Sequence, residues 1–287
     1  MPLEYVIIHS PGGGIGNLIF QHNCGYAIAK KYNAKLIIRS DIIFASTDTQ
    51  RPPFVYYKEL FKHAEFLTGQ EIQQICNNKK GIYYEEPAFK YNIIDIDNTL
   101  EVIILKGFFQ SYKYFENYID DIREVLQSNI QELYSSIEKQ YKSISPEPIL
   151  CNKSVCLHVR RTDFTESWNT IIKEDYYEKA INTLNITDEY ILYVFSDDVN
   201  IIKEWDLWKN YKTIFVDEQD ALRSLYLMSM CNNFIIANST MSLIAYYLRK
   251  DNNAKIILPS KWFGINGPHY DFDDIIPLYS NHSIIIL

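Results

Sequence analysis

The second half of the chain alternates between short apolar segments and segments whose apolar residues recur at helical spacing. Residues 190–195 read Tyr-Ile-Leu-Tyr-Val-Phe and lack the polar alternation of a strand that faces water. Such strands are typical of a parallel sheet covered on both faces. Right-handed crossovers between them would build a doubly wound α/β domain. Strands are expected at 154–160, 190–196, 212–217, 233–238 and 254–258, and helices at 174–185, 199–208, 220–231 and 241–250.

The first half opens with the same pattern, as a strand at 5–10, a helix at 17–32 and a strand at 35–39. Residues 44–98 are less regular. A further strand at 101–105 and a helix at 120–140 are expected after them.

The boundary between the halves is expected where two prolines interrupt the pattern, at Pro146 and Pro148. The sequence therefore predicts two domains of similar architecture, at residues 1–148 and 149–287.

Composition excludes some classes of function. The net charge of -8 argues against a nucleic-acid-binding surface, although a local basic site for an anionic ligand is compatible with it. No apolar run is long enough to cross a bilayer, and no signal peptide is evident, so at most peripheral membrane association is expected. The cysteines are odd in number and lack metal-site spacing, which favours reduced thiols and a cytoplasmic protein. They are Cys24, Cys76, Cys151, Cys156 and Cys231.

The segment His158-Val159-Arg160-Arg161-Thr162-Asp163 follows an apolar strand. Open α/β sheets bind their ligands at the carboxyl ends of strands. The adjacent guanidinium groups of Arg160 and Arg161 are planar, permanently charged donors that suit phosphate. A solvated turn is the alternative interpretation.

A glycine-rich turn, Gly12-Gly13-Gly14-Ile15-Gly16-Asn17, joins the first strand to the first helix. It fails the dinucleotide-binding pattern because Asn17 stands at the last glycine position, and no lysine follows as in a phosphate loop. Its backbone amides lie at a helix start and could meet an anion or a ligand oxygen. Four glycines exceed the need of a turn, which favours close approach of a ligand at Gly14 and Gly16 over a structural turn.

Two further strand ends carry polar residues. In Ser196-Asp197-Asp198, one aspartate, Asp198, is expected to cap the next helix, which leaves Asp197 as a candidate ligand contact. Asn238, Ser239 and Thr240 lie between a strand and a helix. Their hydroxyls and the helix amides would suit a diphosphate, and simple N-capping is an equal alternative.

Evidence for a metal or for acyl transfer is weak in the sequence. Asp95-Ile96-Asp97 resembles the Asp-any-Asp element that holds a metal in many sugar transferases, but such tripeptides are common by chance. The histidines show no ligand spacing, and the Gly-any-Ser-any-Gly elbow is absent. We therefore expect no metal and no cofactor.

Four blocks in a fixed order resemble the α-1,2-fucosyltransferases and, more loosely, the wider α-1,2/α-1,6/protein-O-fucosyltransferase superfamily. A fifth, shorter match lies at residues 195–198. The four blocks are residues 12–21 (GGGIGNLIFQ), 107–115 (GFFQSYKYF), 158–163 (HVRRTD) and 225–240 (LYLMSMCNNFIIANST).

This resemblance implies a GT-B-like fold, with two Rossmann-like domains facing across a cleft, the donor being bound mainly by the C-terminal one. It also implies GDP-β-L-fucose as donor, inversion at the anomeric carbon and no metal requirement. The expected acceptor is the 2-hydroxyl of a terminal galactose in a glycan, as in O-antigen or surface polysaccharide synthesis.

The resemblance also assigns residues. Arg160 would meet the donor diphosphate, with His158 and Asp163 in the same catalytic motif. Asn17 would face the donor from the N-terminal domain, and acceptor binding is expected from Gln110, Ser111, Lys113 and His22. The expected donor-binding set is Asn17, Gly14, Gly16, Arg160, Arg161, Asp197, Asn238, Ser239 and Thr240.

The chain departs from the family pattern at two positions. Thr162 replaces a usual glycine. Ser224 replaces a usual acidic residue that contacts guanine, although Asp220 lies one helical turn earlier. The catalytic base is not identified, and Asp163, Glu166, His22 and Asp41 are all candidates.

Two other functions stay open at this point. One is a different nucleotide-sugar transferase that uses a metal held by Asp95 and Asp97. The other is a non-catalytic carbohydrate-binding protein, against which the two arginines argue, because a lectin has no need to bind a diphosphate.

Overall fold

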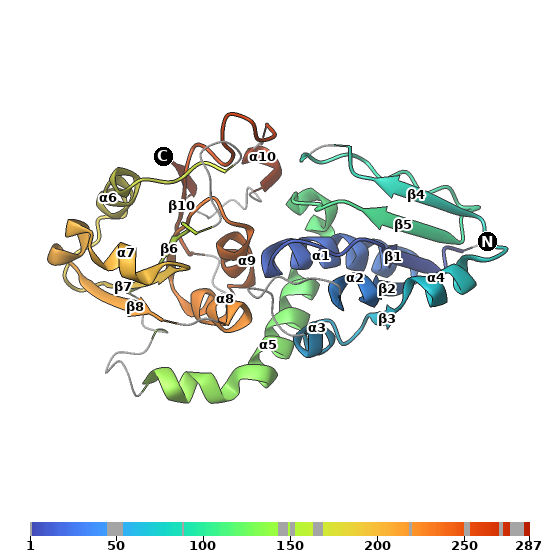
Figure 1. Cartoon of the computed structure of the whole chain (residues 1–287), viewed down its shortest axis with the longest axis horizontal. Coiled ribbons are helices and arrows are strands. Elements are labelled where there is room, and N and C mark those ends of the chain that lie inside the picture. The colour runs from blue at the N-terminus through green and yellow to red at the C-terminus, as the bar shows by residue number, and fades with distance from the viewer. Residues whose placement is uncertain are drawn as a thin grey trace. The chain divides into compact units, whose positions relative to one another are not determined.

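A computed structural model of the protein describes residues 2–44, 54–87, 89–142, 149, 153–162, 169–217, 220–249, 253–269, 272–275 and 284–287. The chain forms two compact units. Unit 1 comprises Met1–Leu133 and Asp271–Pro277, and unit 2 comprises Tyr134–Tyr270 and Leu278–Leu287. Each unit is an α/β structure with its own sheet (Figure 1). The predicted proline linker lies outside the described residues, and the division at residue 148 stays a prediction.

Unit 1 contains a five-stranded sheet in the order β3-β2-β1-β5-β4, with every neighbouring pair parallel. Helix α1 covers β1 and β2 (Figure 1). The strands are β1 Tyr5–Ile8, β2 Lys35–Arg39, β3 Glu65–Leu67, β4 Gly81–Glu85 and β5 Val102–Lys106. The helices are α1 Ile15–Tyr32, α2 Ser40–Phe44, α3 Phe54–Leu60, α4 Gly69–Cys76, α10 Phe272–Ile275 and the short 3-10 helices η1 Tyr112–Tyr114 and η2 Glu116–Tyr118. Helix α5 Ile119–Lys142 begins in unit 1 and continues past Leu133 into unit 2.

Unit 2 contains a six-stranded parallel sheet in the order β11-β10-β9-β6-β7-β8. Helices α8 and α9 lie side by side (Figure 1). The strands are β6 Ser154–Val159, β7 Ile191–Ser196, β8 Lys212–Val216, β9 Asn233–Ile235, β10 Ile256–Leu258 and β11 Ile284–Ile286. The helices are α6 Glu174–Thr183, α7 Val199–Lys203, α8 Ala221–Met230, α9 Thr240–Leu248 and the 3-10 helix η3 Asp206–Asn210.

Both sheets are doubly wound, and the order of their strands marks the places where ligands would bind. In unit 1, the chain builds β2 and β3 on one side of β1, and then β4 and β5 on the other. In unit 2, β7 and β8 lie on one side of β6, with β9 to β11 on the other. Such sheets bind ligands beyond the carboxyl ends of the two strands where the order reverses. These switch points lie between β1 and β5 in unit 1 and between β6 and β9 in unit 2.

The prediction of a buried parallel sheet in the second half is confirmed. Every residue of β6 is buried, and so is every residue of β7 except Ser196. Alternate residues of β6 pack against α6, where the Tyr177 hydroxyl donates to the His158 carbonyl oxygen at 3.2 Å. Tyr176 donates to the Ile236 carbonyl oxygen at 2.8 Å, so these tyrosines satisfy buried backbone oxygens at strand ends.

Helix α1 also matches its prediction. It is buried on nearly all sides, as its broken apolar stripe indicated, because β1 and β2 lie against it together with η1. The helix ends at Asn33, which adopts the left-handed conformation with φ 55°. Asparagine tolerates this conformation better than most residues, so the helix stops there and β2 can begin.

Some elements differ from the prediction. The helix expected at 199–208 is divided into α7 and η3, with Trp205 between them in extended conformation. The irregular region 44–98 contains β3, β4, α3 and α4, and β11 also went unpredicted. Short strands give little periodicity, and the alternate exposure of β4 is that of an edge strand.

No described helix combines the length and apolarity needed to cross a membrane. The cysteines that the structure describes, Cys24, Cys76, Cys156 and Cys231, all have free thiols.

Candidate active site

Asp197 organises the turn that carries the two arginines in unit 2. Its Oδ1 accepts from the Arg161 amide at 2.9 Å, and its Oδ2 accepts from the Thr162 amide at 3.0 Å and from the Thr162 hydroxyl at 2.6 Å. The Arg160 Nε lies 3.3 Å from the same Oδ2. One carboxylate at the end of β7 therefore fixes three consecutive residues that follow β6.

Charge and hydrogen bonding keep this carboxylate ionised. Burial acts to raise the pKa of Asp197, but the Thr162 hydroxyl, the Arg160 charge and the two backbone amides outweigh burial, and the pKa lies below its ordinary value. Arg160 is thus held in place by a full negative charge, with 22% of its side chain exposed. Thr162 contributes its side-chain hydroxyl to this arrangement.

The two arginines point in different directions. The Arg161 guanidinium carbon lies 4.9 Å from the centroid of the Trp205 ring, within the range of a cation–π interaction. Arg161 Nε is buried without a hydrogen-bond partner among the described residues. The two side chains therefore have different partners, which leaves Arg160 as the arginine held at the switch point of unit 2.

His158 is buried at the carboxyl end of β6, with 2% of the residue exposed. Burial first, and then the Arg160 charge, lowers the pKa of the ring to about 4, with Asp197 acting in the opposite direction. The imidazole is therefore neutral at physiological pH. Its Nδ1 has no hydrogen-bond partner among the described residues. Asp163, the last residue of the motif, lies outside them, as does Glu166.

The other strand at this switch point, β9, leads to α9. The buried Asn238 side chain donates from Nδ2 to the carbonyl oxygens of Thr170 at 2.9 Å and Trp262 at 2.6 Å. Asn238 thereby joins the loop after β9 to two other loops. Ser239 is the N-cap residue of α9, yet its side chain makes no capping hydrogen bond. Thr240 begins the helix, whose amide end carries a partial positive charge.

Two aspartates of unit 2 act as helix caps. Asp198 accepts from the Ile201 amide at 3.3 Å, which confirms its predicted role at the start of α7. Asp220 accepts from the amides of Leu222 and Arg223, both at 3.0 Å, and caps α8. Ser224 is buried, with 7% of the residue exposed.

The glycine turn at the switch point of unit 1 is held by α1. Gly13 has φ 78°, and a Cβ there would lie 2.2 Å from Asn17 Nδ2, so a side chain is excluded on both grounds. At Gly14, the N-cap residue of α1, a Cβ would meet nothing within 4 Å. Gly16 is buried in the helix. Gln21 was not predicted to take part, but its Oε1 accepts from the Gly12 amide at 3.1 Å.

In the turn after β5, Gln110 Nε2 donates a hydrogen bond to Asn17 Oδ1 near the start of α1, at 2.8 Å. The structure thus brings together Gln110, which was predicted to bind the acceptor sugar, and Asn17, which was predicted to face the nucleotide-sugar donor. Ser111 accepts from the Lys113 amide at 3.3 Å and caps η1. Lys113 forms an ion pair with Asp274 of α10, with Nζ and Oδ1 2.6 Å apart. The remaining acceptor candidate, His22, is part of a buried cluster.

Both ring nitrogens of His22 are occupied within unit 1. Nδ1 lies 2.9 Å from Asn23 Oδ1, and Nε2 lies 2.6 Å from His63 Nε2. The ring stacks on Phe61 at a centroid distance of 4.2 Å, and 1% of the residue is exposed. Burial first, and then His63, lowers its pKa well below the ordinary value.

Glu86 is a functional candidate that the sequence analysis missed. Its Oε2 accepts from the amides of Phe108 and Phe109, both at 2.8 Å. Gly107 has φ 156°, and a Cβ there would lie 2.4 Å from Glu86 Cβ. Glu86 therefore shapes the turn that leads to Gln110. Burial raises its pKa to about 7 against the opposing effect of the two amides and Tyr114.

We expect Glu86→Gln to flatten the pH dependence of stability. The folded-state pKa of about 7 exceeds the ordinary 4.5, so the native state binds more protons than the unfolded chain between these values. The free energy of unfolding of the unaltered protein should therefore fall as pH rises from 4.5 to 7, by up to about 3 kcal/mol. Urea titrations of both proteins at pH 5 and pH 8 measure this. An equal pH response would show that Glu86 titrates normally.

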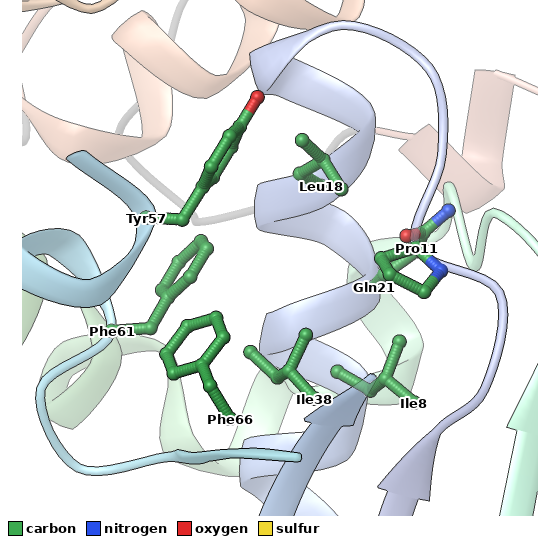
Figure 2. A pocket seen from close by; sticks show the side chains of 8 residues that line it. All are labelled: Ile8, Pro11, Leu18, Gln21, Ile38, Tyr57, Phe61 and Phe66. Atoms are coloured by element: carbon green, nitrogen blue, oxygen red, sulfur yellow. The ribbon is translucent and has the colours of Figure 1, made fainter. Parts of the chain in front are cut away.

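A small apolar hollow lies beside the glycine turn, between α1, α3 and the ends of β1 and β2 (Figure 2). Its free space of about 10 Å³ is the room that a single water needs, so it is too small for a sugar. The residues that line it are Ile8, Pro11, Leu18, Gln21, Ile38, Tyr57, Phe61 and Phe66.

The Asp-any-Asp element has a local structural role. Asp97 Oδ1 accepts from the Thr99 amide at 2.7 Å and shapes the turn before β5. Within the described parts of the chain, no three His, Cys, Asp or Glu side chains are grouped as a metal site requires.

Comparison with known proteins places these features in a family. The sequence profile of glycosyl transferase family 11 matches residues 16–263. The chain is 25% identical over 290 residues to the Escherichia coli O-antigen biosynthesis glycosyltransferase WbnK, a match that covers 88% of this chain and 94% of that protein. It is 24% identical over 285 residues to an E. coli α-1,2-colitosyltransferase, covering 90% and 92%.

Two more distant matches extend the comparison. A galactoside 2-α-L-fucosyltransferase of Caenorhabditis elegans is 26% identical over 167 residues, covering 56% of this chain and 39% of that protein. The structure of a mutant Arabidopsis thaliana FUT1 in complex with GDP is 11% identical with a TM-score of 0.51, covering 89% and 70%, which supports the fold alone. The profile match spans most of the chain, and the chain belongs to glycosyl transferase family 11.

Proposed function

We propose that this family 11 glycosyltransferase moves L-fucose from GDP-β-L-fucose to the 2-hydroxyl of a terminal galactose in a glycan, with inversion at the anomeric carbon. The observation that carries the proposal is the placement of Arg160. It follows β6 at the switch point of unit 2 and is held there by the ionised Asp197. The other strand at this point leads to the amide end of α9.

This arrangement suits the departure of a nucleoside diphosphate. Negative charge grows on the diphosphate as the bond to the sugar breaks, and preorganised donors stabilise such charge at little reorganisation cost. The Arg160 guanidinium can hold two phosphate oxygens at once. The first amides of α9 and the Ser239 hydroxyl, which makes no capping bond, are suited to the same anion.

Unit 1 would supply the contacts to the sugars. Asn17, near the start of α1, and Gln110, in the turn after β5, are joined by a hydrogen bond beside β1 and β5, the two strands at its switch point. Inversion requires the galactose hydroxyl to attack the anomeric carbon from the side opposite to GDP. The glycine turn, with open space at Gly14, allows a ligand to approach its backbone closely.

The names of relatives support the sugar and the acceptor. One relative is a galactoside 2-α-L-fucosyltransferase, and another takes part in O-antigen biosynthesis. A third is named an α-1,2-colitosyltransferase. Colitose lacks the 3-hydroxyl of L-fucose, so GDP-colitose is the second candidate donor, and a direct comparison of the two sugars decides between them.

Thermal melting with a set of nucleotides and nucleotide sugars tests the proposal. We expect GDP and GDP-fucose to stabilise the protein, by about 2.7 kcal/mol at a hundredfold excess over Kd. UDP and UDP-galactose should stabilise it far less. Stabilisation by UDP-galactose equal to that by GDP-fucose would contradict the proposal, whereas greater stabilisation by GDP-colitose would change only the sugar.

A further inference from the structure

A second polar cluster lies at the switch point of unit 1, where His9 and Ser10 follow β1. The His9 amide donates to the Leu105 carbonyl oxygen of β5 at 3.0 Å, which places the pair beside both strands of the switch point. His9 Nδ1 lies 3.0 Å from Ser10 Oγ, and His9 Nε2 lies 3.0 Å from Arg39 Nη1. The Arg160 site uses none of these residues.

The cluster continues into a rigid ion pair. Arg39 Nε and Nη2 donate to the two carboxylate oxygens of Asp41, both at 2.9 Å. Asp41 Oδ1 also accepts from the Gly69 amide at 3.1 Å. A Cβ on Gly69 would lie 2.8 Å from Arg39 Nη2, so the start of α4 packs closely against the guanidinium. These contacts hold the Arg39 guanidinium in the position from which it donates to His9.

The chemistry of Arg39 settles the protonation of His9. A guanidinium only donates hydrogen bonds, so His9 Nε2 must accept and the ring proton must lie on Nδ1. Burial first, then Arg39 and Lys106, lowers the pKa of His9, and Asp41 opposes them. The ring is therefore neutral at physiological pH, and Nδ1 donates to Ser10 Oγ.

Ser10 is thereby prepared to donate a hydrogen bond. Its oxygen accepts from His9, so its hydroxyl proton points to a different partner. Ser10 makes no other hydrogen bond among the residues that the structure describes, and it is partly exposed. A ligand that offers oxygen acceptors at the switch point, such as a sugar hydroxyl or ring oxygen, would complete the arrangement.

We propose that Ser10 binds the acceptor sugar by donating its hydroxyl proton to a sugar oxygen, and that His9, Arg39 and Asp41 are positioning residues that set this direction. The inference rests on the proposed glycosyl transfer and adds a specific acceptor contact to it. His9 is not the catalytic base, because a proton on Nε2 would displace the Arg39 hydrogen bond.

The first test is Ser10→Ala, assayed with GDP-fucose as donor and lactose as a galactose-terminated acceptor. Loss of one hydrogen bond to the sugar should raise the KM for lactose about tenfold. The stabilisation by GDP should be unchanged, because the donor site is untouched. Thr183→Ala, which removes an exposed hydroxyl of α6, is the control and should change neither quantity.

Two variants of His9 separate positioning from a purely structural role. The amide nitrogen of Asn in His9→Asn can replace Nδ1 as donor to Ser10, so the KM for lactose should stay within about twofold of normal. The amide of Gln in His9→Gln reaches Arg39 instead and leaves Ser10 without its donor, so the KM should rise as in Ser10→Ala. If His9 had only a structural role, both variants would have lower melting temperatures. The KM for lactose would then not differ between His9→Asn and His9→Gln.

The outcomes distinguish this inference from the proposed function. A normal KM for lactose in an active Ser10→Ala enzyme would overturn the Ser10 contact alone. Equal KM values for His9→Asn and His9→Gln would overturn the positioning role of His9. If GDP failed to stabilise the unaltered protein and no transfer occurred, the proposed function would fail, and the acceptor contact with it.

Discussion

Arg160→Ala is expected to abolish measurable transfer, and Arg160→Lys is expected to lower kcat at least about 100-fold, by analogy with the loss of one oxyanion donor. Arg160 is held 3.3 Å from Asp197 at the switch point of unit 2, where it would meet the leaving diphosphate. Lysine keeps the positive charge but loses the planar pair of donors that binds two phosphate oxygens together. Initial rates of GDP release in the presence of acceptor measure the effect.

Arg161→Ala is the matched control, because this neighbour lies over Trp205 instead. Its loss should cost about 0.5–1 kcal/mol of stability through the cation–π interaction and lower the rate less than the loss of Arg160 does. Melting curves of all variants must show that the fold is intact. Near-normal rates for Arg160→Lys would exclude bidentate phosphate binding, and full activity of Arg160→Ala would mean that the active site lies elsewhere.

Asp197→Asn is expected to lower transfer about 100-fold, because small displacements of catalytic groups cost this much. The carboxylate receives the hydrogen bonds of Arg161 and Thr162 as well as the charge of Arg160. The asparagine side chain keeps the shape of the aspartate but lacks the charge that holds Arg160. Its NH2 group would face the backbone amides of Arg161 and Thr162, which are themselves hydrogen-bond donors. We therefore also expect a loss of about 2 kcal/mol in the free energy of unfolding.

The loss of stability caused by Asp197→Asn should depend on pH. The pKa of Asp197 lies below its ordinary 3.8 in the folded protein. Its stabilising contribution is therefore present above 3.8 and is lost as pH falls through the lower, folded-state value. The difference between the unaltered protein and Asp197→Asn should shrink below pH 3.8.

Asp198→Asn is the control for this substitution. Asp198 is adjacent in sequence and caps α7 through the Ile201 amide, a role that asparagine also fills well. Urea titrations and initial rates should therefore change little for this variant. If Asp197→Asn behaved like Asp198→Asn, the turn that carries Arg160 would not depend on the Asp197 charge.

The pattern of unit 2 could be predicted because its strands are buried on both faces. A continuous apolar run such as residues 190–195 is stable as a strand only where both of its faces are buried, as in a covered parallel sheet. The polar residues that follow these strands, including Arg160 and Asn238, were therefore located at the correct edge of the sheet. Asp198 was identified as a cap from its position one residue before a helix.

The roles of single polar residues were harder to foresee, because contacts between distant parts of the chain decide them. Glu86 meets Phe108 only because β4 and β5 are neighbours, and β4 was not predicted. Arg39 reaches His9 across adjacent strands β1 and β2. His22 was assigned to acceptor binding, yet its helix carries it into a buried cluster beside His63. Residue type and spacing do not encode these pairings.

The decisive experiment for metal-independent fucosyl transfer is product analysis with GDP-fucose and lactose in the presence of EDTA. We predict GDP release at the same rate as without EDTA, and a trisaccharide whose fucose is α-linked to the galactose 2-hydroxyl, as NMR of the product would show. Transfer that required added manganese or magnesium would contradict metal-independent departure of GDP at Arg160. Binding of lactose with no release of GDP would contradict a transferase and identify a carbohydrate-binding protein instead.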